Sequence, residues 1–464
     1  MVFSSTLFIF QFLPVALILY YIVPKKAKNL VLVIVSLFFY SWGEFRYFPI
    51  MIATIAVNYY CALGMEWYGH KKGVRKLLLA AALVVSFGFL FVFKYLGFFT
   101  ENINFFLPDL LPRVNLVLPL GISFYTFQTL SYTIDVYKRK IKPDSNIIDI
   151  AAFVALFPAL IAGPIVRYTD IAKELKEHRI TAAGLDDGME DFIIGLAKKV
   201  IIANNIGALW TEIEYLGFDS ISTGLAWLAA LGFSLQIYFD FSGYSQMAIG
   251  IGKMLGFNFP KNFDNPYSSR SVTEFWRRWH MTLGSWFREY VYFPLGGSRK
   301  GNFRTVLNLF IVWALTGLWH GASWNFVLWG LFFFALLTIE KFGIQNTLDK
   351  SKVFSRIYII VILIVGWMLF AITDFGDLLT FLTKMFVPTF ITDDAPVGII
   401  YYLRNYAVII AIGCWFSTKF SSEFYKNKIR TRRVLRNALL VVLFLLSVAY
   451  LVDSTYNPFL YFRF

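Results

Sequence analysis

Charged residues are scarce in this sequence of 464 amino acids. They make up 16% of it, whereas a typical soluble domain carries about 25%. Hydrophobic residues make up 58%, the mean hydropathy is +0.61, and phenylalanine alone occurs 51 times. So few charges cannot cover a water-facing surface, which excludes a soluble globular protein and predicts an integral membrane protein.

Cysteine and histidine are also rare, with two and four residues respectively. Cys61 and Cys414 lie in separate apolar stretches, where a cysteine is most simply a small packing residue. These residues show no zinc-type spacing, and no Gly-Lys-Ser/Thr sequence follows the glycine pair Gly296 and Gly297. We therefore expect no metal, no bound cofactor and no phosphate-binding loop.

Long apolar runs are abundant instead. A helix needs about 20 apolar residues to cross the hydrocarbon core. Candidate spans are residues 6–23, 30–43, 48–67, 77–98, 114–134, 147–163, 190–209, 223–254, 305–341 (as two helices), 356–374, 401–420 and 437–453. The runs are continuous rather than alternating with period two, which favours helices over strands. We predict an all-α protein with about 11 to 13 transmembrane or re-entrant helices.

The basic residues, which give a net charge of +14, occur in short clusters between these runs. The clusters are residues 25–28, 70–76, 138–142, 299–304 and 426–436. This is the pattern of cytoplasmic loops, which carry excess Lys and Arg, and it argues against a nucleic-acid partner. The sequence before residues 7–23 has no basic segment, so we interpret this run as a retained first span. The clusters at 25–28 and 70–76 close the first and third spans and should be cytoplasmic, which places the N-terminus outside the cell.

The middle of the chain differs from its ends. Residues 164–190 are charged and amphipathic, which is typical of a cytoplasmic or interfacial segment. Residues 257–300 are rich in Pro, Gly, Arg, Trp and Tyr, and irregular backbone at membrane depth requires surrounding protein or a water-filled cavity. We find no internal repeat. The predicted organisation is a single polytopic domain, 1–464, with N-terminal helices (1–113), a core (114–345) and C-terminal helices (346–464).

His320 is the most informative residue, because ionisable groups inside membrane spans are costly and therefore suggest function. Counting from Arg304, it lies about 24 Å along a helix, towards the outer half of the membrane. Gly317 and Gly321 would allow another chain or a substrate to approach the imidazole closely. A neutral imidazole there suits a general base that deprotonates a hydroxyl for acyl transfer. The alternative is a hydrogen-bonded packing histidine.

Four further residues are candidates with equally simple structural alternatives. His280 lies among arginines and tryptophans that could equally form an aromatic belt at the membrane interface. Arg277 and Arg278 could pair with the phosphates of an acyl donor or with lipid headgroups. Asp240 could orient a histidine, pair with an arginine inside the bundle, or form a purely structural ion pair.

Two long motifs resemble the signature of the membrane-bound O-acyltransferase superfamily. They are EFWRRWHMTLGSWFREYVYFPLGGSRKG at residues 274–301 and GLWHGASWN at residues 317–325. Similar segments occur at residues 118–127, 157–164 and 236–244. The opening at residues 1–5 and the ending at 457–464 resemble the branch that contains the membrane subunit of alginate O-acetyltransferase. The resemblance covers nearly the whole chain.

This resemblance implies a funnel through the membrane, with re-entrant helices around it. In such proteins the histidine corresponding to His320 is the catalytic residue, where a cytoplasmic donor tunnel meets an external acceptor funnel. His280 would line the same passage, and the motif makes Trp319 and Asn325 candidates for it, together with Asp240, Arg277 and Arg278.

The leading functional hypothesis is an O-acyltransferase in the bacterial cytoplasmic membrane. It would move an acyl group, most simply acetyl, from acetyl-CoA or an acyl carrier protein to a cell-surface or exported polysaccharide. An extracytoplasmic acyltransferase related to SGNH hydrolases would complete the transfer. One alternative is D-alanyl transfer to teichoic acid, although residues 295–301 resemble the acetyltransferase branch more. Another is a transporter or flippase, which predicts inverted repeats that the sequence does not show.

Overall fold

The computed structural model describes residues 1–389, 398–453 and 460, and the regular elements among these residues are all helices, with no strand. The acidic residues Asp393 and Asp394 and most of the ending at 457–464 lie outside the described residues. The helices form two compact units: residues 1–192 with 244–261, and residues 193–243 with 262–464. Helices α11 (Ala182–Ala197) and α13 (Thr223–Met254) each contribute to both units.

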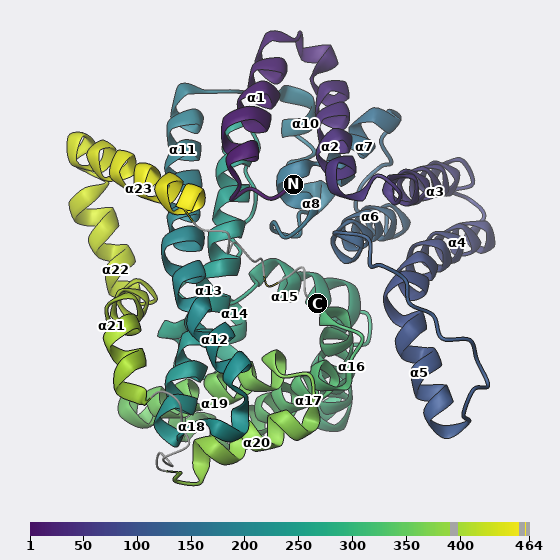
Figure 1. Cartoon of the computed structure of the whole chain (residues 1–464). Coiled ribbons are helices and arrows are strands. Elements are labelled where there is room, and N and C mark those ends of the chain that lie inside the picture. The colour runs from purple at the N-terminus through teal and green to yellow at the C-terminus, as the bar shows by residue number, and fades with distance from the viewer. Residues whose placement is uncertain (390–397, 454–459, 461–464) are drawn as a thin grey trace. The chain divides into compact units, whose positions relative to one another are not determined.

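The first unit contains the N-terminal helices (Figure 1). They are α1 (Leu13–Ile22), α2 (Lys28–Glu44), α3 (Phe48–Trp67), α4 (Lys72–Leu90), α5 (Leu96–Phe106), α6 (Ile122–Tyr137), α7 (Ile147–Ala155), α8 (Phe157–Leu160), α9 (Tyr168–Ile171) and α10 (Glu174–Glu177). Helices α3, α4 and α6 pack on one another. A side chain at Gly250 would lie 2.6 Å from the Gly188 carbonyl oxygen, so α11 and α13 cross at a point where only glycine fits.

The second unit contains the remaining helices. They are α12 (Asn204–Leu216), α14 (Val272–Arg278), α15 (Met281–Phe287), α16 (Gly301–His320), α17 (Trp324–Ile339), α18 (Gln345–Lys350), α19 (Lys352–Ala371), α20 (Phe375–Phe386), α21 (Ile399–Phe416), α22 (Lys419–Phe424) and α23 (Arg433–Asp453). Helices α16 and α17 lie side by side, and α17 also packs on α19 (Figure 1). The segment predicted to be irregular, 257–300, consists here of short helices α14 and α15 with turns between them.

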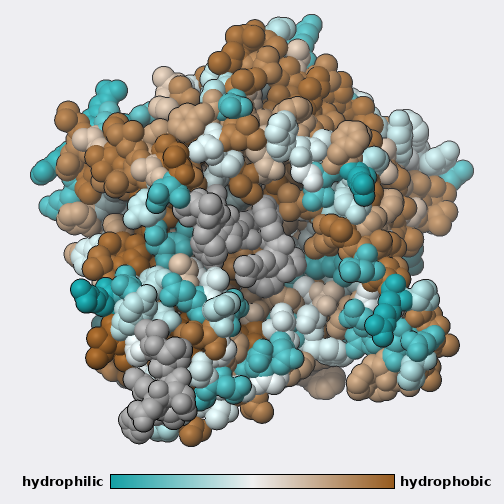
Figure 2. Space-filling view, viewed as in Figure 1, coloured by the Kyte–Doolittle hydropathy of each residue, from teal (hydrophilic) through white to brown (hydrophobic). Residues whose placement is uncertain are grey.

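Eight helices among the described residues are long and apolar enough to cross a membrane. They are Phe48–Trp67, Lys72–Phe106, Ala182–Leu216, Thr223–Met254, Trp324–Lys350, Lys352–Ala371, Ile399–Phe416 and Arg433–Asp453. Figure 2 shows apolar residues over broad areas of the visible face, interrupted by polar clusters. The prediction of an all-α integral membrane protein is confirmed.

Two predicted spans are shorter than expected, for local reasons. The run 114–134 becomes helical only at Ile122, because the preceding Gly121 adopts a left-handed conformation with φ 71°. The run 147–163 divides into α7 and α8 at Leu156, where the backbone leaves the helical region and Pro158 begins the next helix. The run 305–341 forms two helices, as predicted.

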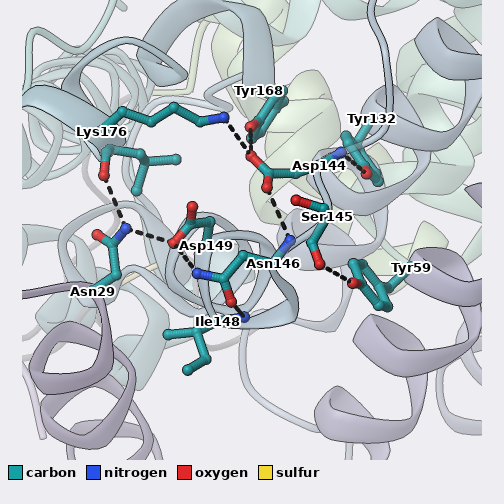
Figure 3. A network of polar contacts seen from close by, with 11 residues as sticks. Asn29, Tyr59, Tyr132, Asp144, Ser145, Asn146, Ile148, Asp149, Tyr168 and Lys176 are labelled. Carbon is teal, nitrogen blue, oxygen red and sulfur yellow. Dashed lines mark hydrogen bonds and ion pairs between the residues drawn. The ribbon is translucent and has the colours of Figure 1, made fainter. Parts of the chain in front are cut away.

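A polar network in the first unit fixes the segment between α6 and α7 (Figure 3). The Asp144 carboxylate accepts a hydrogen bond from the Tyr168 hydroxyl at 2.6 Å and pairs with the Lys176 ammonium group at 3.1 Å. Its other oxygen accepts the Asn146 amide N–H at 3.0 Å. Asp144 is therefore one of the residues that hold the segment predicted to be interfacial, 164–190, to the bundle.

Candidate active site

His280 occupies a strained turn between two short helices. Helix α14 ends at Arg278 and α15 begins at Met281, and His280 between them has φ 43° and ψ 52°. This left-handed conformation is costly for a residue with a side chain and is concentrated at functional sites. The residue is 2% exposed. The fold therefore places a single imidazole at a fixed, strained position inside the second unit.

Asn262 sets the protonation pattern of this imidazole. Its Oδ1 accepts the Thr282 amide N–H at 3.3 Å, which identifies that atom as the oxygen, because a backbone amide can only donate. His280 Nδ1 lies 3.1 Å from the same oxygen and must therefore be the protonated nitrogen. A neutral imidazole with its proton on Nδ1 carries a lone pair on Nε2.

The lone pair on His280 Nε2 is available. This atom is buried and has no hydrogen-bond partner within the part of the chain that the structure describes. A buried polar atom without a partner costs about 1–3 kcal/mol, and a ligand group that donates to Nε2 would remove this cost. The geometry gives His280 an oriented base that lacks only a donor.

His320 is the last residue of α16 and is enclosed by aromatic rings. The centroid of its ring lies 5.0 Å from that of Trp329 and 5.2 Å from that of Phe370, both in edge-to-face arrangements. The residue is 7% exposed. The imidazole of His320 is therefore held by ring packing and lies away from bulk water.

Trp319 connects the two histidines. Its ring centroid is 5.9 Å from that of His280 and 4.9 Å from that of His320. Residues 40 positions apart in the sequence are thus brought to one indole ring. The structure thus brings the two sequence motifs together at the Trp319 ring.

The glycines beside His320 serve helix packing. A side chain at Gly317 would lie 2.4 Å from the Phe326 carbonyl oxygen, and one at Gly321 would overlap the Phe326 ring. Helix α17 therefore occupies the space that these glycines leave. Of the two partners expected from the sequence, another chain segment or a substrate, the structure shows the chain segment.

Asn325 affects His320 through neighbouring residues rather than by direct contact. Its amide nitrogen donates to the carbonyl oxygens of Leu369 and Phe370, at 3.3 and 3.2 Å. Those residues lie in the last turn of helix α19, and the Phe370 ring packs against His320. Asn325 thus fixes the wall of the histidine pocket rather than reaching the imidazole.

The two arginines of α14 have different environments. Arg278 pairs with Glu274 at 2.9 Å and donates to the Asp264 carbonyl oxygen at 3.3 Å. Arg277 is exposed, and its side chain forms no hydrogen bond or ion pair with the described residues. Both line a cavity of about 920 Å³ in the second unit.

Asp240 is paired with a lysine rather than with a histidine or an arginine. The Lys199 ammonium group lies 2.6 Å from Asp240 Oδ1 and donates to Asn204 Oδ1 at 2.8 Å. Asp240 Oδ2 accepts the Leu460 amide N–H at 2.9 Å. Both charged side chains are almost fully buried. Sequence analysis missed Lys199, which lies inside an apolar span and would have been found by the same rule that selected Asp240.

Glu340 is a second buried acid that the sequence analysis did not select. Its carboxylate accepts the amide N–H groups of Val272 and Thr273 at 2.5 and 2.8 Å, and the Thr273 hydroxyl at 2.7 Å. These are the first residues of α14, where an anion is favoured by the helix dipole. Glu340 therefore anchors the helix that leads to His280. No cluster of potential metal ligands occurs among the residues that the structure describes.

The chain belongs to the membrane-bound O-acyltransferase family, whose model matches residues 5–374. It is 36% identical to a probable alginate O-acetylase of Pseudomonas putida over 493 aligned positions, which cover the whole of both chains. It is 37% identical to a peptidoglycan O-acetyltransferase of Helicobacter pylori, over 74% of this chain and 70% of that protein. A teichoic acid D-alanyltransferase of Bacillus subtilis is 30% identical over half of this chain. The predicted superfamily and its enzyme class are confirmed.

Proposed function

We propose that this membrane-bound O-acyltransferase passes acetyl groups from a cytoplasmic thioester to a hydroxyl group destined for a cell-surface polysaccharide. The observation that carries the proposal is the meeting of His280 and His320 at the Trp319 ring, with an unpartnered lone pair on His280 Nε2 among the described residues. End-to-end similarity to a probable alginate O-acetylase supports acetyl as the acyl group and a glycan as the acceptor. Family membership decides against the transporter alternative.

The chemistry requires one base and one carbonyl. The acceptor hydroxyl oxygen attacks the thioester carbonyl carbon, an O–C bond forms and the C–S bond breaks. The hydroxyl proton passes to the imidazole of His320 and from there to the departing thiolate, so that no net charge is left on the protein. His280 Nε2 can accept a hydrogen bond from an amide N–H of the thioester arm and so hold the reacting groups in line.

The topology of this proposal follows from the basic clusters. With those clusters in the cytoplasm, the N-terminus lies outside the cell, and the protein resides in the bacterial cytoplasmic membrane. The donor, acetyl-CoA or an acylated carrier protein, then enters from the cytoplasmic side. The acceptor hydroxyl belongs either to the glycan or to an extracytoplasmic acyltransferase of the SGNH-hydrolase type that relays the acetyl group.

Replacement of His320 tests the proposal directly. In cells, the His320→Ala variant is expected to lose acetylation of the surface polymer, measured as acetate released by mild alkali, while its membrane level is unchanged. His70→Ala is the matched control, because His70 is an exposed histidine in a basic loop and should leave acetylation intact. Normal acetylation in the His320→Ala cells would refute the catalytic assignment.

D-alanyl transfer is the second candidate, supported by the partial similarity to the Bacillus subtilis protein. The turn at residues 295–301 supports acetyl transfer, because its sequence resembles the acetyltransferase branch. A hydrogen bond and three glycines give this turn a defined conformation. Asn308 donates to the Gly297 carbonyl oxygen at 2.8 Å, and Gly296, Gly297 and Gly301 all have positive φ. The same alkali hydrolysate distinguishes the two: acetate supports the proposal, and D-alanine the alternative.

A further inference from the structure

Acyl transfer creates a negative charge that the two histidines do not neutralise. When the acceptor oxygen attacks the thioester carbonyl carbon, the carbonyl oxygen becomes an oxyanion, and acyl-transfer enzymes direct hydrogen-bond donors at this atom. A base such as His320 takes up the hydroxyl proton and leaves the oxyanion without a partner. The N–H of His280 is already bound to Asn262. The proposed reaction therefore requires a further donor close to His320.

Trp329 carries such a donor. It lies on α17 and is completely buried, and its ring packs edge to face against that of His320 with 5.0 Å between the centroids. Its Nε1 is buried and has no hydrogen-bond partner among residues 1–389, 398–453 and 460. An indole N–H can only donate, so no change of protonation satisfies it. The unmade bond destabilises the folded chain, and an acceptor brought in by a substrate would remove this penalty.

Other groups near His320 are already committed. The amide nitrogen of Asn325 donates to two carbonyl oxygens of α19. The Thr316 hydroxyl, one turn before His320, donates to a backbone carbonyl oxygen at 2.7 Å. Phe370, which also encloses the imidazole, has an apolar side chain. Trp329 thus combines direct ring contact with the base and a donor that the described residues leave unused.

The position of the Trp329 ring is fixed by its neighbours. The centroids of Trp276 and Phe333 lie 5.4 and 5.2 Å from its own, both in edge-to-face arrangements. The next residue, Gly330, leaves no room for a side chain between α17 and the Trp313 carbonyl oxygen of α16. The donor is therefore positioned before the charge develops, and a hydrogen bond to an anion is strong in apolar surroundings.

The spacing of the two rings suits a reacting carbonyl group. A general base lies about 3 Å from the hydroxyl oxygen whose proton it takes. That oxygen attacks the carbonyl carbon, so the carbonyl oxygen lies within a few ångströms of His320. The Trp329 ring lies in this range, at 5.0 Å from the imidazole between centroids. One bound thioester can therefore contact both side chains.

We propose that the Trp329 Nε1–H donates a hydrogen bond to the oxyanion of the tetrahedral intermediate. The hydroxyl oxygen bonds to the carbonyl carbon, the π electrons of the carbonyl move to its oxygen, and His320 takes the hydroxyl proton. The C–S bond then breaks, the carbonyl re-forms, and the thiolate takes up the proton. This inference rests on the proposed function and deepens it, because it adds a catalytic residue to the two histidines.

The assay uses inside-out membrane vesicles from cells that make the polymer, because these contain the full chain with its own acceptor. Labelled acetyl-CoA is the probe, and the label that mild alkali releases from the polymer measures transfer. Two variants remove the indole N–H: Trp329→Phe, and Trp329→benzothienylalanine, which keeps the shape of the ring and has sulfur in place of the N–H. In both, kcat should fall about 10²–10³-fold, the scale for the loss of one oxyanion donor.

Two readouts separate this role from packing. KM for acetyl-CoA should stay near that of the original chain, because the donor acts on a charge that exists only after attack. The benzothienylalanine variant should melt at the same temperature as the original chain or higher, since it loses only an unsatisfied group. Trp227→Phe is the matched control, because its indole N–H donates to the Met385 carbonyl oxygen at 2.8 Å. It should lower the melting temperature and keep kcat per folded molecule.

The outcomes distinguish this inference from the proposed function. An unchanged kcat in the benzothienylalanine variant would overturn the oxyanion role and leave the proposed function standing, whatever the effect of Trp329→Phe. A loss of kcat that matches the loss of folded protein in both variants would assign the ring to packing and also overturn it. Vesicles with the original chain that transfer no acetyl from acetyl-CoA would refute the proposed function, and the inference with it.

Discussion

Two buried polar sites in the second unit differ in one respect. In the Lys199–Asp240 pair each charge has an opposite charge beside it: the Lys199 ammonium group lies 2.6 Å from Asp240 Oδ1 and also donates to Asn204, and Asp240 Oδ2 accepts the Leu460 amide N–H. His280 is incomplete, because Nδ1 is bound to Asn262 and Nε2 has no partner within the described residues. If the energetic cost of burying an ionisable group were the only criterion, both sites would be selected as functional.

The two sites differ in whether the buried group has a partner within the protein. A buried ion pair in which each charge faces its counter-charge can serve structure alone. An oriented lone pair with no donor is destabilising until a ligand arrives, and the fold retains it. We infer that Lys199 and Asp240 hold the bundle together and that His280 acts in the reaction.

The largest expected effect is the most direct test of the distinction between His280 and the Lys199–Asp240 pair. His280→Ala should lower the rate of acetyl transfer by about 10²–10³-fold, the scale for the loss of one preorganised hydrogen-bonding group at the reacting atoms, with unchanged thermal stability. The double variant Lys199→Met/Asp240→Leu, which removes the charged pair as a unit, should retain its rate per folded molecule. Initial rates at equal amounts of folded protein measure both. Equal losses of rate in the two variants would contradict the distinction.

The next effect concerns stability. Lys199→Met alone leaves the Asp240 carboxylate buried without its counter-charge and should destabilise the protein by about 3–5 kcal/mol. The double variant Lys199→Met/Asp240→Leu should recover most of that loss, because two apolar residues replace a pair whose desolvation is costly. Thermal unfolding in detergent provides the measurement. A single variant as stable as the original chain would show that the pair contributes nothing to the bundle.

A smaller effect sharpens the role of Asn262. Asn262→Leu removes the acceptor that orients the imidazole and should lower the transfer rate by up to about 100-fold. Asn262→Asp restores an acceptor, and its negative charge favours the protonated imidazole, so the acidic limb of the pH–rate profile should move to higher pH. A purely structural role for Asn262 would lower the yield of folded protein and leave the pH profile in place.

The sequence predicts the spans of this protein well because a hydrophobic run is a local signal. The run 223–254 coincides with α13, and the motifs around His280 and His320 mark residues that the fold brings to one indole ring. The hydrogen-bond partners of those residues could not be predicted from a local signal. Asn262 lies 18 residues before His280, in a segment with no regular period, and only the folded turn brings its Oδ1 to Nδ1. Lys199 was not selected from the sequence because the long side chain of a lysine within an apolar run normally extends to the membrane interface.

The smallest effect extends the comparison to the first unit. Burial alone would raise the pKa of Asp144, but hydrogen bonds from Tyr168 and Asn146 and the charge of Lys176 outweigh it and lower the pKa below its usual value. A lowered carboxyl pKa stabilises the fold above the pKa of the unfolded chain, and this stability is lost as the pH falls through the folded value.

Asp144→Asn should therefore remove part of the acid sensitivity of thermal unfolding, and it costs less than about 1 kcal/mol at neutral pH for the ion pair, because Lys176 is largely exposed. Asp109→Asn is the control, since Asp109 is an exposed acid in a loop of the same unit. Melting temperatures measured between pH 7 and the acid limit of solubility compare the three proteins. The amide has nearly the same shape as the carboxylate that it replaces, so the comparison isolates the charge. If Asp144→Asn has the same acid profile as the original chain, protonation of Asp144 is not coupled to unfolding, although the residue is charged and buried. Asp144 would then resemble neither the Lys199–Asp240 pair nor His280.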